Sequence, residues 1–340
     1  MKLVSFHNKD SEERAGIFYQ DKIFDIENAG KFCDLSFPST INLLLLDWEK
    51  YIDNLYKLFE KIKNGSIESE IDLSSVKLLS PVPHPASCRD GYAFRQHVEA
   101  ARRNRGVEMI PEFDQYPVFY FTNHNAVFGP GEILVEDDHL IQLDFELEAA
   151  IVISKKGKNI TSDKADEYIA GYMIMNDFSA RLLQMEEMKL NLGPAKGKDF
   201  ATSLGPWLVT PDELDEFKVQ TEFGCKYNLS MKAFHNGRLV SSGNMIDMNW
   251  TFAEIIERAS YGVELFPGDV IGSGTVGTGC YLELNGTWAR EAKLKGESFS
   301  PIWLQDGDII ELEIDKLGKL SNKIVKSPFS YSILAKKKKS

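Results

Sequence analysis

Two glutamates interrupt an otherwise apolar stretch near the middle of the chain. Glu146 and Glu148 lie within LDFELEAAIVI, residues 143–153. Side chains of a strand alternate between its two faces, so both carboxylates would point to the same side. Two buried like charges are costly unless positive charge neutralises them, and an oxygen-bound hard divalent cation is the simplest source of that charge. The alternative is a half-exposed edge strand with one polar face.

The composition limits the classes of protein to which the chain can belong. Its 340 residues are 43% hydrophobic and 26% charged, which is ordinary for a soluble globular protein. The formal net charge of −12 argues against nucleic acid as a partner. It also requires that any anionic substrate meet locally placed cations.

Location is predicted from what the chain does not contain. No run approaches the roughly 20 apolar residues of a membrane span, and the N-terminal residues lack the apolar core of a signal peptide. The cysteines form no CxxC pair and suit a reducing compartment; they are Cys33, Cys88, Cys225 and Cys280. We therefore expect a cytoplasmic protein with no membrane partner.

The chain divides by composition into a small leading part and a larger remainder. Strand-like pieces at residues 2–6, 16–19 and 22–25 precede a helical pattern over 40–63. Prolines at alternate positions in SPVPHP, residues 80–85, favour an extended linker. We predict an N-terminal β-containing domain over 1–80, a catalytic domain over 81–335 and a solvated basic tail over 336–340.

The larger part reads as β-rich with scattered helices. Helices are predicted at 96–104, 163–170, 180–188 and 252–258, and strands at 149–154, 207–210, 226–235, 270–272, 281–284 and 309–314. The glycine-rich run 272–279 lacks the Gly-Lys-Ser/Thr ending of a phosphate loop and predicts a turn lining a pocket. The fold class is α+β without regular βαβ units, so a Rossmann or TIM fold is not expected.

Two further acids extend the glutamate pair. Asp90 and Asp177 each stand beside arginine-containing segments, CRDGYAFRQH and MIMNDFSAR. Asp177 alone could equally cap the following helix. Together, the four carboxylates would make an oxygen site suited to Mg²⁺, Ca²⁺ or Mn²⁺ rather than zinc.

Three other polar residues are candidates for chemistry, and each has a plainer explanation. His97, near the start of a predicted helix, could be a surface or core histidine. Lys198, between a glycine and an aspartate, could be a solvated loop charge. Glu283 lies within the apolar segment YLEL and needs either a partner or an exposed face.

These fragments occur together and in order, and residues 80–330 resemble the fumarylacetoacetate hydrolase family. The resemblance implies a mixed β-sandwich or roll domain behind a small N-terminal domain. It implies Asp90, Glu146, Glu148 and Asp177 as metal ligands, His97 as the catalytic histidine and Glu283 as the acid that orients it. It also implies oxyanion donors at Lys198 and Gln184, a threonine at Thr202 near the metal-and-lysine cluster, and substrate contacts at Tyr92, Tyr120, Arg181 and Thr275.

Two positions depart from the eukaryotic hydrolase of that family. Gly106 stands where that enzyme has a substrate-binding arginine, so Arg105 or Arg103 would have to serve instead. Met188 stands where it has a tyrosine. Both changes concern the far end of the substrate and leave the metal centre intact.

The expected activity is metal-dependent cleavage of a C–C bond in a β-diketo acid. Fumarylacetoacetate is the leading substrate, with His97 and Glu283 activating water, and Mg²⁺ or Ca²⁺ as cofactor (Mn²⁺ as an alternative). Acylpyruvate hydrolysis, oxaloacetate decarboxylation and isomerisation or decarboxylation of 2-hydroxy-diene-dioates would use the same site. A non-catalytic ligand-binding protein is the alternative of another class. The resemblance further implies a homodimer acting in tyrosine or aromatic-compound breakdown.

Overall fold

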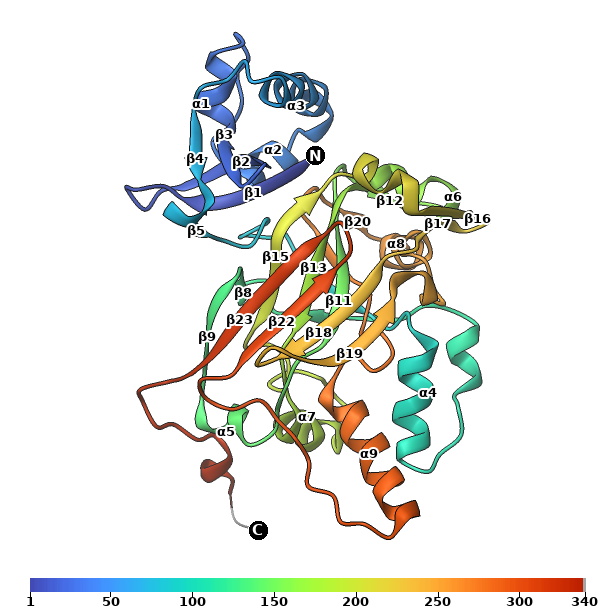
Figure 1. The fold of residues 1–340 in the computed structure, drawn as a ribbon. Helices are drawn as coiled ribbons and strands as arrows, with labels where there is room; N and C mark the ends of the chain where they lie inside the picture. The colour runs from blue at the N-terminus through green and yellow to red at the C-terminus, as the bar shows by residue number, and fades with distance from the viewer. Residues whose placement is uncertain (339–340) are drawn as a thin grey trace.

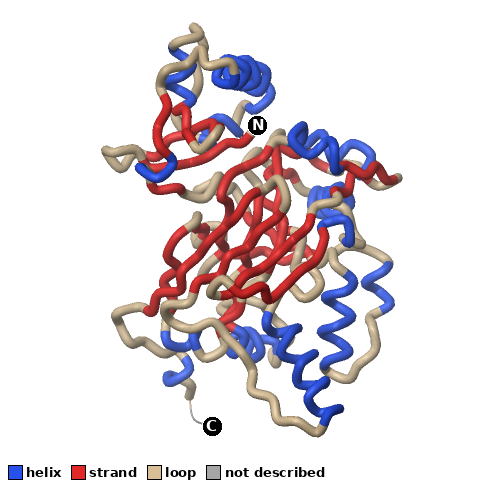
Figure 2. The backbone as a smooth tube through the Cα atoms, in the orientation of Figure 1, coloured by secondary structure: helices blue, strands red, loops and turns tan. Residues whose placement is uncertain are grey.

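A large mixed β-sheet forms the centre of the protein, whose computed structural model describes residues 1–338 (Figures 1 and 2). The sheet has twelve strands, of which β5 (Lys77–Leu78) pairs with β1 and β8 (Val127–Phe128) pairs with β15. The others follow in the order β4 (Glu70–Asp72), β3 (Lys22–Asp25), β2 (Glu13–Tyr19), β1 (Lys2–His7), β15 (Thr202–Val209), β13 (Ile169–Asp177), β11 (Leu147–Ile153), β21 (Val270–Gly272), β6 (Cys88–Gly91) and β7 (Phe119–Thr122).

A second sheet packs on one face of the first and makes a sandwich. Its order is β19 (Arg238–Asn244), β18 (Ser230–His235), β22 (Ile309–Ile314), β23 (Gly318–Lys326) and β9 (Gly131–Val135). Strands β22 and β23 lie across β13 and β15 (Figure 1). Ile151 of β11 packs between the sheets with Leu312 and Ile324 of the second sheet.

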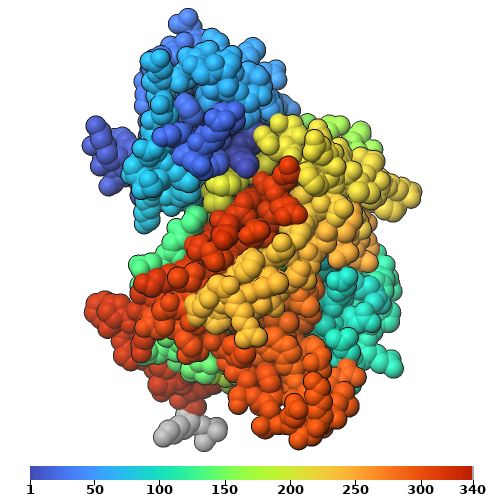
Figure 3. Space-filling view, in the orientation of Figure 1, coloured from blue at the N-terminus to red at the C-terminus, as the bar shows by residue number. Residues whose placement is uncertain are grey.

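The opposite face of the large sheet is also covered. Ala150 and Val152 of β11 join a second core that includes Leu55 and Leu58 of the N-terminal region. That region carries α1 (Ile26–Lys31), α2 (Ile41–Leu45) and α3 (Trp48–Lys63), and forms a lobe at one end of the molecule (Figure 3). Strand β11 is therefore central and buried on both faces, and the edge-strand alternative is wrong.

Most remaining helices lie beyond the ends of the sheets. Helix α4 (Arg95–Asn104) packs along α9 (Tyr281–Lys295), and α5 (Asp137–Leu140) lies beside α7 (Arg181–Met188) (Figure 1). Helix α6 (Ser162–Ala165) packs on α8 (Phe252–Ser260). Short ladders join β10 (Leu143–Asp144) to β14 (Ser179–Ala180), β12 (Gly157–Lys158) to β20 (Glu264–Leu265), and β16 (Lys218–Thr221) to β17 (Gly224–Tyr227). Within residues 1–338, no helix has both the length and the apolar character needed to cross a membrane.

The predicted β-rich α+β fold is confirmed, and several element predictions are corrected. Residues 281–284 begin helix α9 instead of forming a strand. The helix predicted over 163–170 ends at Ala165, and a 3₁₀ turn then leads into β13. The helical pattern over 40–63 is two helices, and β17 and β18 divide the strand predicted over 226–235.

The boundary predicted near residue 80 stays a prediction. Strand β1 pairs with β15, so the N-terminal strands continue the same sheet as the rest of the chain. Of the predicted basic tail, Lys339 and Ser340 lie outside the described residues.

Candidate active site

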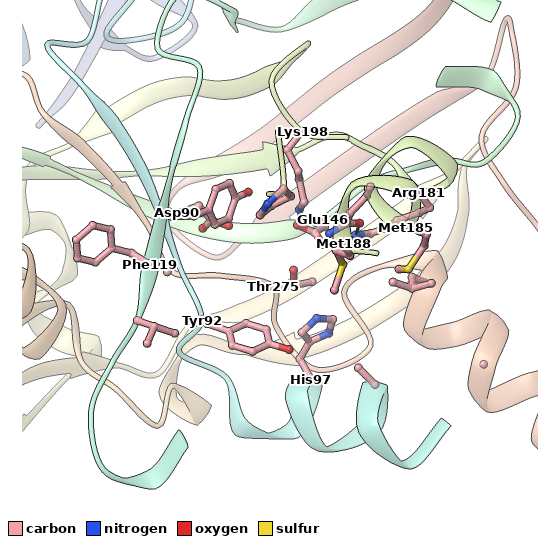
Figure 4. Close-up of a pocket in the computed structure, with 18 of the residues that line it drawn as sticks. Asp90, Tyr92, His97, Phe119, Glu146, Arg181, Met185, Met188, Lys198 and Thr275 are labelled. Carbon is pink, nitrogen blue, oxygen red and sulfur yellow. Dashed lines mark hydrogen bonds and ion pairs between the residues drawn. The ribbon is translucent and has the colours of Figure 1, made fainter. Parts of the chain in front are cut away.

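A cavity of about 460 Å³ opens where the strand ends of the large sheet meet α4 and α7 (Figure 4). Its wall contains the predicted site residues Asp90, Tyr92, His97, Arg105, Tyr120, Glu146, Arg181, Gln184, Lys198 and Thr275. The other predicted residues, Glu148, Asp177 and Glu283, lie behind this wall and hydrogen-bond to residues in it. The structure therefore brings together residues that span nearly two hundred positions of the chain.

Strand direction brings the four carboxylates to one edge of the sheet. Strand β13 ends at this edge with Asp177, and Asp90 is the last residue but one of β6, which ends at the same edge. The antiparallel strand β11 begins there just after Glu146. Oxygens of Asp90, Glu146 and Glu148 lie within 4.8 Å of one another. Glu146 itself has left the ladder, because its backbone N–H donates to the Asn176 side chain at 3.0 Å.

The glycine-rich turn after β21 is shaped by these acids. The backbone N–H of Gly274 donates to Asp90 Oδ1 and to Glu148 Oε2, both at 3.1 Å. A Cβ atom on Gly272 would lie 2.6 Å from Asp90 Oδ1, so a side chain at that position would collide with the carboxylate. The turn thus provides donors for charges that solvent cannot reach.

Two buried cations hold one side of the cluster. Lys198 Nζ donates to Asp177 Oδ2 at 2.8 Å and also contacts Glu146. Arg181 Nη2 donates to Glu146 Oε1 at 2.7 Å, and its Nε donates to Asp144 at 2.8 Å. Burial alone would raise the pKa of Glu146, but the charges of Lys198 and Arg181 outweigh burial and lower that pKa to about 2.

Negative charge nevertheless remains in excess. Five carboxylates face the two cations; they are Asp90, Asp144, Glu146, Glu148 and Asp177. Burial and the charge of Asp177 raise the pKa of Asp90 to about 7. Burial, with the charge of Asp90, raises the pKa of Glu148 well above its ordinary value. These carboxylates would ionise readily only beside additional positive charge.

The donor set fits a hard divalent cation. Asp177 Oδ1 is buried and has no hydrogen-bond partner within residues 1–338, which leaves an oxygen available for a ligand. The cluster offers carboxylate oxygens and a net negative charge, and Mg²⁺, Ca²⁺ and Mn²⁺ all prefer such oxygens. Asp177 does not cap α7, so the alternative role considered from the sequence is wrong: Ala180 occupies the capping position.

A histidine–glutamate pair forms the neighbouring wall. His97 Nδ1 lies 2.7 Å from Glu283 Oε2, and the other oxygen of Glu283 accepts the Thr278 N–H at 2.9 Å. His97 points into the cavity (Figure 4), and its Nε2 makes no hydrogen bond within the described chain. Glu283 lies in the first turn of α9, which packs along α4, and that packing brings the two side chains together.

Asp144 is a residue that sequence reasoning missed. Its carboxylate accepts the N–H groups of Tyr281 at 2.7 Å and Leu282 at 2.9 Å, so it stabilises the start of α9 from a distant segment. The same carboxylate binds Arg181. Asp144 thereby links the helix that carries Glu283 to the cation that holds Glu146. Its place two residues before Glu146 in a buried stretch was the available signal.

Some of the predicted substrate-binding residues are already hydrogen-bonded within the protein, and others still have donors available for a substrate. Arg181 donates to the carboxylates of Asp144 and Glu146 and to the side-chain amide oxygen of Gln184, so it holds the site together. The Tyr120 hydroxyl donates to Asp177, and Thr275 Oγ1 donates to Glu148 at 3.3 Å. The Gln184 amide group, the Tyr92 hydroxyl and the Arg105 guanidinium remain as donors in the cavity wall. Thr202 pairs with Asp177 across the β13–β15 ladder.

The two departures noted in the sequence have structural explanations. Gly106 follows the C-terminal cap of α4 and has a φ of +73°, a conformation that favours glycine over arginine. The preceding Arg105 lines the cavity, whereas Arg103 does not. Met188 lines the wall beside Met185, so the far end of the cavity is partly apolar (Figure 4).

Comparison with known proteins agrees with this geometry. Residues 87–325 match the family model described as "Fumarylacetoacetate (FAA) hydrolase C-terminal". The chain belongs to the fumarylacetoacetate hydrolase family. It is therefore an enzyme of a family of hydrolases, isomerases and tautomerases.

Two curated relatives in this family cover most of the chain. It is 31% identical over 323 residues to "Oxaloacetate tautomerase YisK" of Bacillus subtilis, covering 91% of this chain and 94% of that protein. It is 30% identical over 281 residues to maleylpyruvate hydrolase of Aquipseudomonas alcaligenes, covering 81% and 90%. Among solved structures, maleylpyruvate hydrolase from Sphingobium sp. SYK-6, in complex with manganese(II) and pyruvate, has a TM-score of 0.66 at 22% identity, covering 96% and 100%. The last comparison shows the fold.

Proposed function

We propose that this protein is a divalent-cation-dependent tautomerase of a 2-oxo acid, with oxaloacetate as the leading substrate. The observation that carries the proposal is the free Nε2 of His97, which faces a cavity bordered by an acidic cluster with unsatisfied charge. Moving a proton on and off the carbon beside a keto group needs a base and a means of stabilising the enolate. The similarity to an oxaloacetate tautomerase over 91% of the chain supports the choice of substrate.

The residues of the chain divide the work between proton transfer and binding. His97 Nε2 accepts the proton from the substrate carbon, and Glu283 stabilises the imidazolium that forms. The Tyr92 hydroxyl and the Gln184 amide face the cavity and can donate to the substrate oxygen on which charge develops. Arg105 supplies a free cation for the remote carboxylate. A divalent cation held by Asp90, Glu146, Glu148 and Asp177 would supply Lewis-acid stabilisation of the enolate.

The test follows enol–keto exchange of oxaloacetate by ultraviolet absorbance, with Mg²⁺ or Mn²⁺ present. His97→Gln should lower kcat by about 10²- to 10⁴-fold, the usual contribution of a general base. His139→Gln is the matched control, because that histidine stacks on Phe200 and does not line the cavity. Equal activity of His97→Gln and wild type would contradict the proposal. Release of CO₂ at the rate of enol loss would reveal decarboxylation instead.

Carbon–carbon hydrolysis is the second candidate. In this reaction His97 would take the proton from water instead of from the substrate carbon, which makes the water nucleophilic. Lys198 and Gln184 would donate hydrogen bonds to the oxyanion that forms when the water attacks. The cavity continues past His97 to Met185 and Met188, which leaves room for an acyl chain longer than oxaloacetate provides. Similarity to maleylpyruvate hydrolase and to Arabidopsis thaliana fumarylacetoacetase, 32% identical over 215 residues, supports this reaction class.

A substrate panel separates the two candidates. Oxaloacetate, fumarylacetoacetate, maleylpyruvate and simple acylpyruvates are compared by kcat/KM under one set of conditions. Fumarylacetoacetate, the substrate expected from the sequence, takes second place to oxaloacetate in our proposal. The predicted homodimer, cytoplasmic location and role in tyrosine or aromatic-compound breakdown stay predictions, and light scattering would measure the first.

A further inference from the structure

A buried thiol stands beside the cavity and has no part in the proposed reaction. Cys280 immediately precedes α9, is fully buried and forms no disulfide. Ligand atoms of Cys280, His97 and Glu146 lie within 4.8 Å of one another. One sulfur, one imidazole nitrogen and one carboxylate oxygen therefore converge from three separate segments.

The histidine in this group is oriented as metal-binding histidines are. Its Nδ1 is held by the Glu283 carboxylate at 2.7 Å, and the remaining ring nitrogen has no partner. Histidines that ligate metals nearly always pair their second nitrogen with a carboxylate or carbonyl in this way. His97 is 7% exposed and Glu146 4% exposed, so solvent competes little for either group.

We propose that His97, Glu146 and Cys280 form an inhibitory site for a thiophilic divalent cation, with zinc as the expected ion. The acidic cluster offers only oxygen and suits hard cations, whereas sulfur with imidazole nitrogen and carboxylate is a set that zinc prefers. On binding, the Cys280 thiol releases its proton to solvent and a sulfur–zinc bond forms. The inhibitory effect rests on the proposed function, since zinc on His97 Nε2 occupies the lone pair that accepts the proton.

The shared ligand couples this site to the acidic cluster. Glu146 is held by Arg181 and Lys198, so zinc must weaken at least one of these contacts. Magnesium competes with zinc for Glu146 alone, because a hard cation has little affinity for a thiolate or a neutral imidazole. Added Mg²⁺ should therefore fail to restore activity to the zinc-inhibited enzyme, while a chelator should restore it.

Binding can be measured without turnover. Cobalt(II), a spectroscopic substitute for zinc, is titrated into Mg²⁺-saturated protein while the near-ultraviolet thiolate-to-cobalt charge-transfer band is followed. The wild type should develop the band with one equivalent of cobalt, and zinc should abolish it. Cys280→Ser should lack the band and weaken zinc inhibition by at least about 100-fold, because a direct ligand is lost. Serine is favoured at a helix start, so this variant should fold.

Controls keep the two proposals distinguishable. Cys225→Ala removes a different buried thiol, in β17, and should keep both the band and the zinc sensitivity. Cys280→Ala with a wild-type circular dichroism spectrum should match Cys280→Ser. A band that persists without Cys280, or no band in the wild type, would overturn the site even if oxaloacetate is turned over. A Cys280-dependent band in a protein inactive on the whole panel would overturn the proposed function and leave the site standing.

Discussion

Asp144 offers the sharpest test of how the site is assembled. Its fully buried carboxylate accepts from the first two N–H groups of α9 and from Arg181 Nε, at 2.7, 2.9 and 2.8 Å. Helix α9 positions Glu283 against His97, and Arg181 holds Glu146. The substitution Asp144→Asn keeps the size of the side chain and removes its charge. We therefore expect it to weaken both connections at once.

The expected loss of stability follows from these contacts. Breaking a buried ion pair costs about 3–5 kcal/mol when the partner is left alone, but Arg181 retains Glu146, so we expect about 2–3 kcal/mol. Asparagine keeps one acceptor oxygen for the helix, which limits the loss of capping to about 0.5 kcal/mol, the low end of cap substitutions. The sum is about 3 kcal/mol. A displacement of about 1 Å at Glu283 would additionally lower kcat by about 100-fold.

Asp25→Asn is the matched control. Asp25 is also buried, also begins a helix by accepting the Asn28 N–H at 2.9 Å, and also pairs with an arginine, Arg14, at 2.7 Å. It lies in the N-terminal lobe and does not line the cavity. Its substitution should lower stability by a similar amount and leave kcat unchanged.

The assay combines urea denaturation with kcat measured where each variant is folded. The change in midpoint at constant slope reports stability. A wild-type kcat in folded Asp144→Asn would refute the positioning role. So would an equal loss of kcat in Asp25→Asn, because that loss would reflect general destabilisation.

Three further outcomes are expected. Glu283→Gln should lower kcat by about 100-fold without changing the melting temperature, because it removes the charge that stabilises the His97 imidazolium. Steady-state kinetics and calorimetry measure the two quantities, and an unaltered kcat would contradict the role of the His97–Glu283 pair. Mg²⁺ or Mn²⁺ at about 100 times its Kd should raise the free energy of unfolding by about 2.7 kcal/mol, a gain that EDTA reverses and that Asp177→Asn should largely abolish. Burial, reinforced by the charge of Lys196, lowers the pKa of His139 from 6.5 to about 4, so the unfolded chain binds the proton more tightly and stability should fall as the pH drops from 6.5 toward 4. Partial exposure limits this loss of stability to about 2 kcal/mol. The Glu136 N–H donates to His139 Nδ1 at 3.1 Å at the start of α5, and a glutamine side chain can accept the same hydrogen bond. His139→Gln should therefore lose the pH dependence, and parallel curves for both proteins would refute the assignment.

The acidic cluster could be predicted because its signal is local. The side chains of a strand alternate between its two faces, so the spacing of Glu146 and Glu148 predicts a shared environment from three residues alone. Asp177 follows another apolar run that ends in an acid, whereas Asp90 follows Cys88 and Arg89 and has no such run before it. The pairing of His97 with Glu283 could not be predicted from local sequence, because no pattern near either residue indicates its partner. Their pairing depends on α4 packing along α9, a contact between segments 186 residues apart.

Helix α9 shows why the remainder could not be predicted. Residues 281–284 form a short apolar segment with one acid, which is typical of a strand, and the position before them, Cys280, provides no side-chain cap. The acceptors for the first N–H groups come from Asp144, 137 residues earlier. A helix whose start is stabilised from another segment carries no local signal. The pairing of β1 with β15 is non-local in the same way, so the sequence gives no indication that the N-terminal strands continue the central sheet.

The position of Asp144 also explains why one strand carries both the core and the chemistry. Strand β11 contributes Ile151 to the sandwich core and Val152 to the second core, so its backbone is held on both faces. The backbone just before β11 is held in place by the same packing. It carries Asp144 and Glu146, which both bind the Arg181 side chain. A surplus of buried negative charge would otherwise push such side chains apart. Because the packing resists that movement, the repulsion persists, and a cation that binds in the cluster gains affinity by relieving it. Ile151→Ala should loosen this packing and therefore weaken cation binding, even though the Ile151 side chain faces away from the carboxylates.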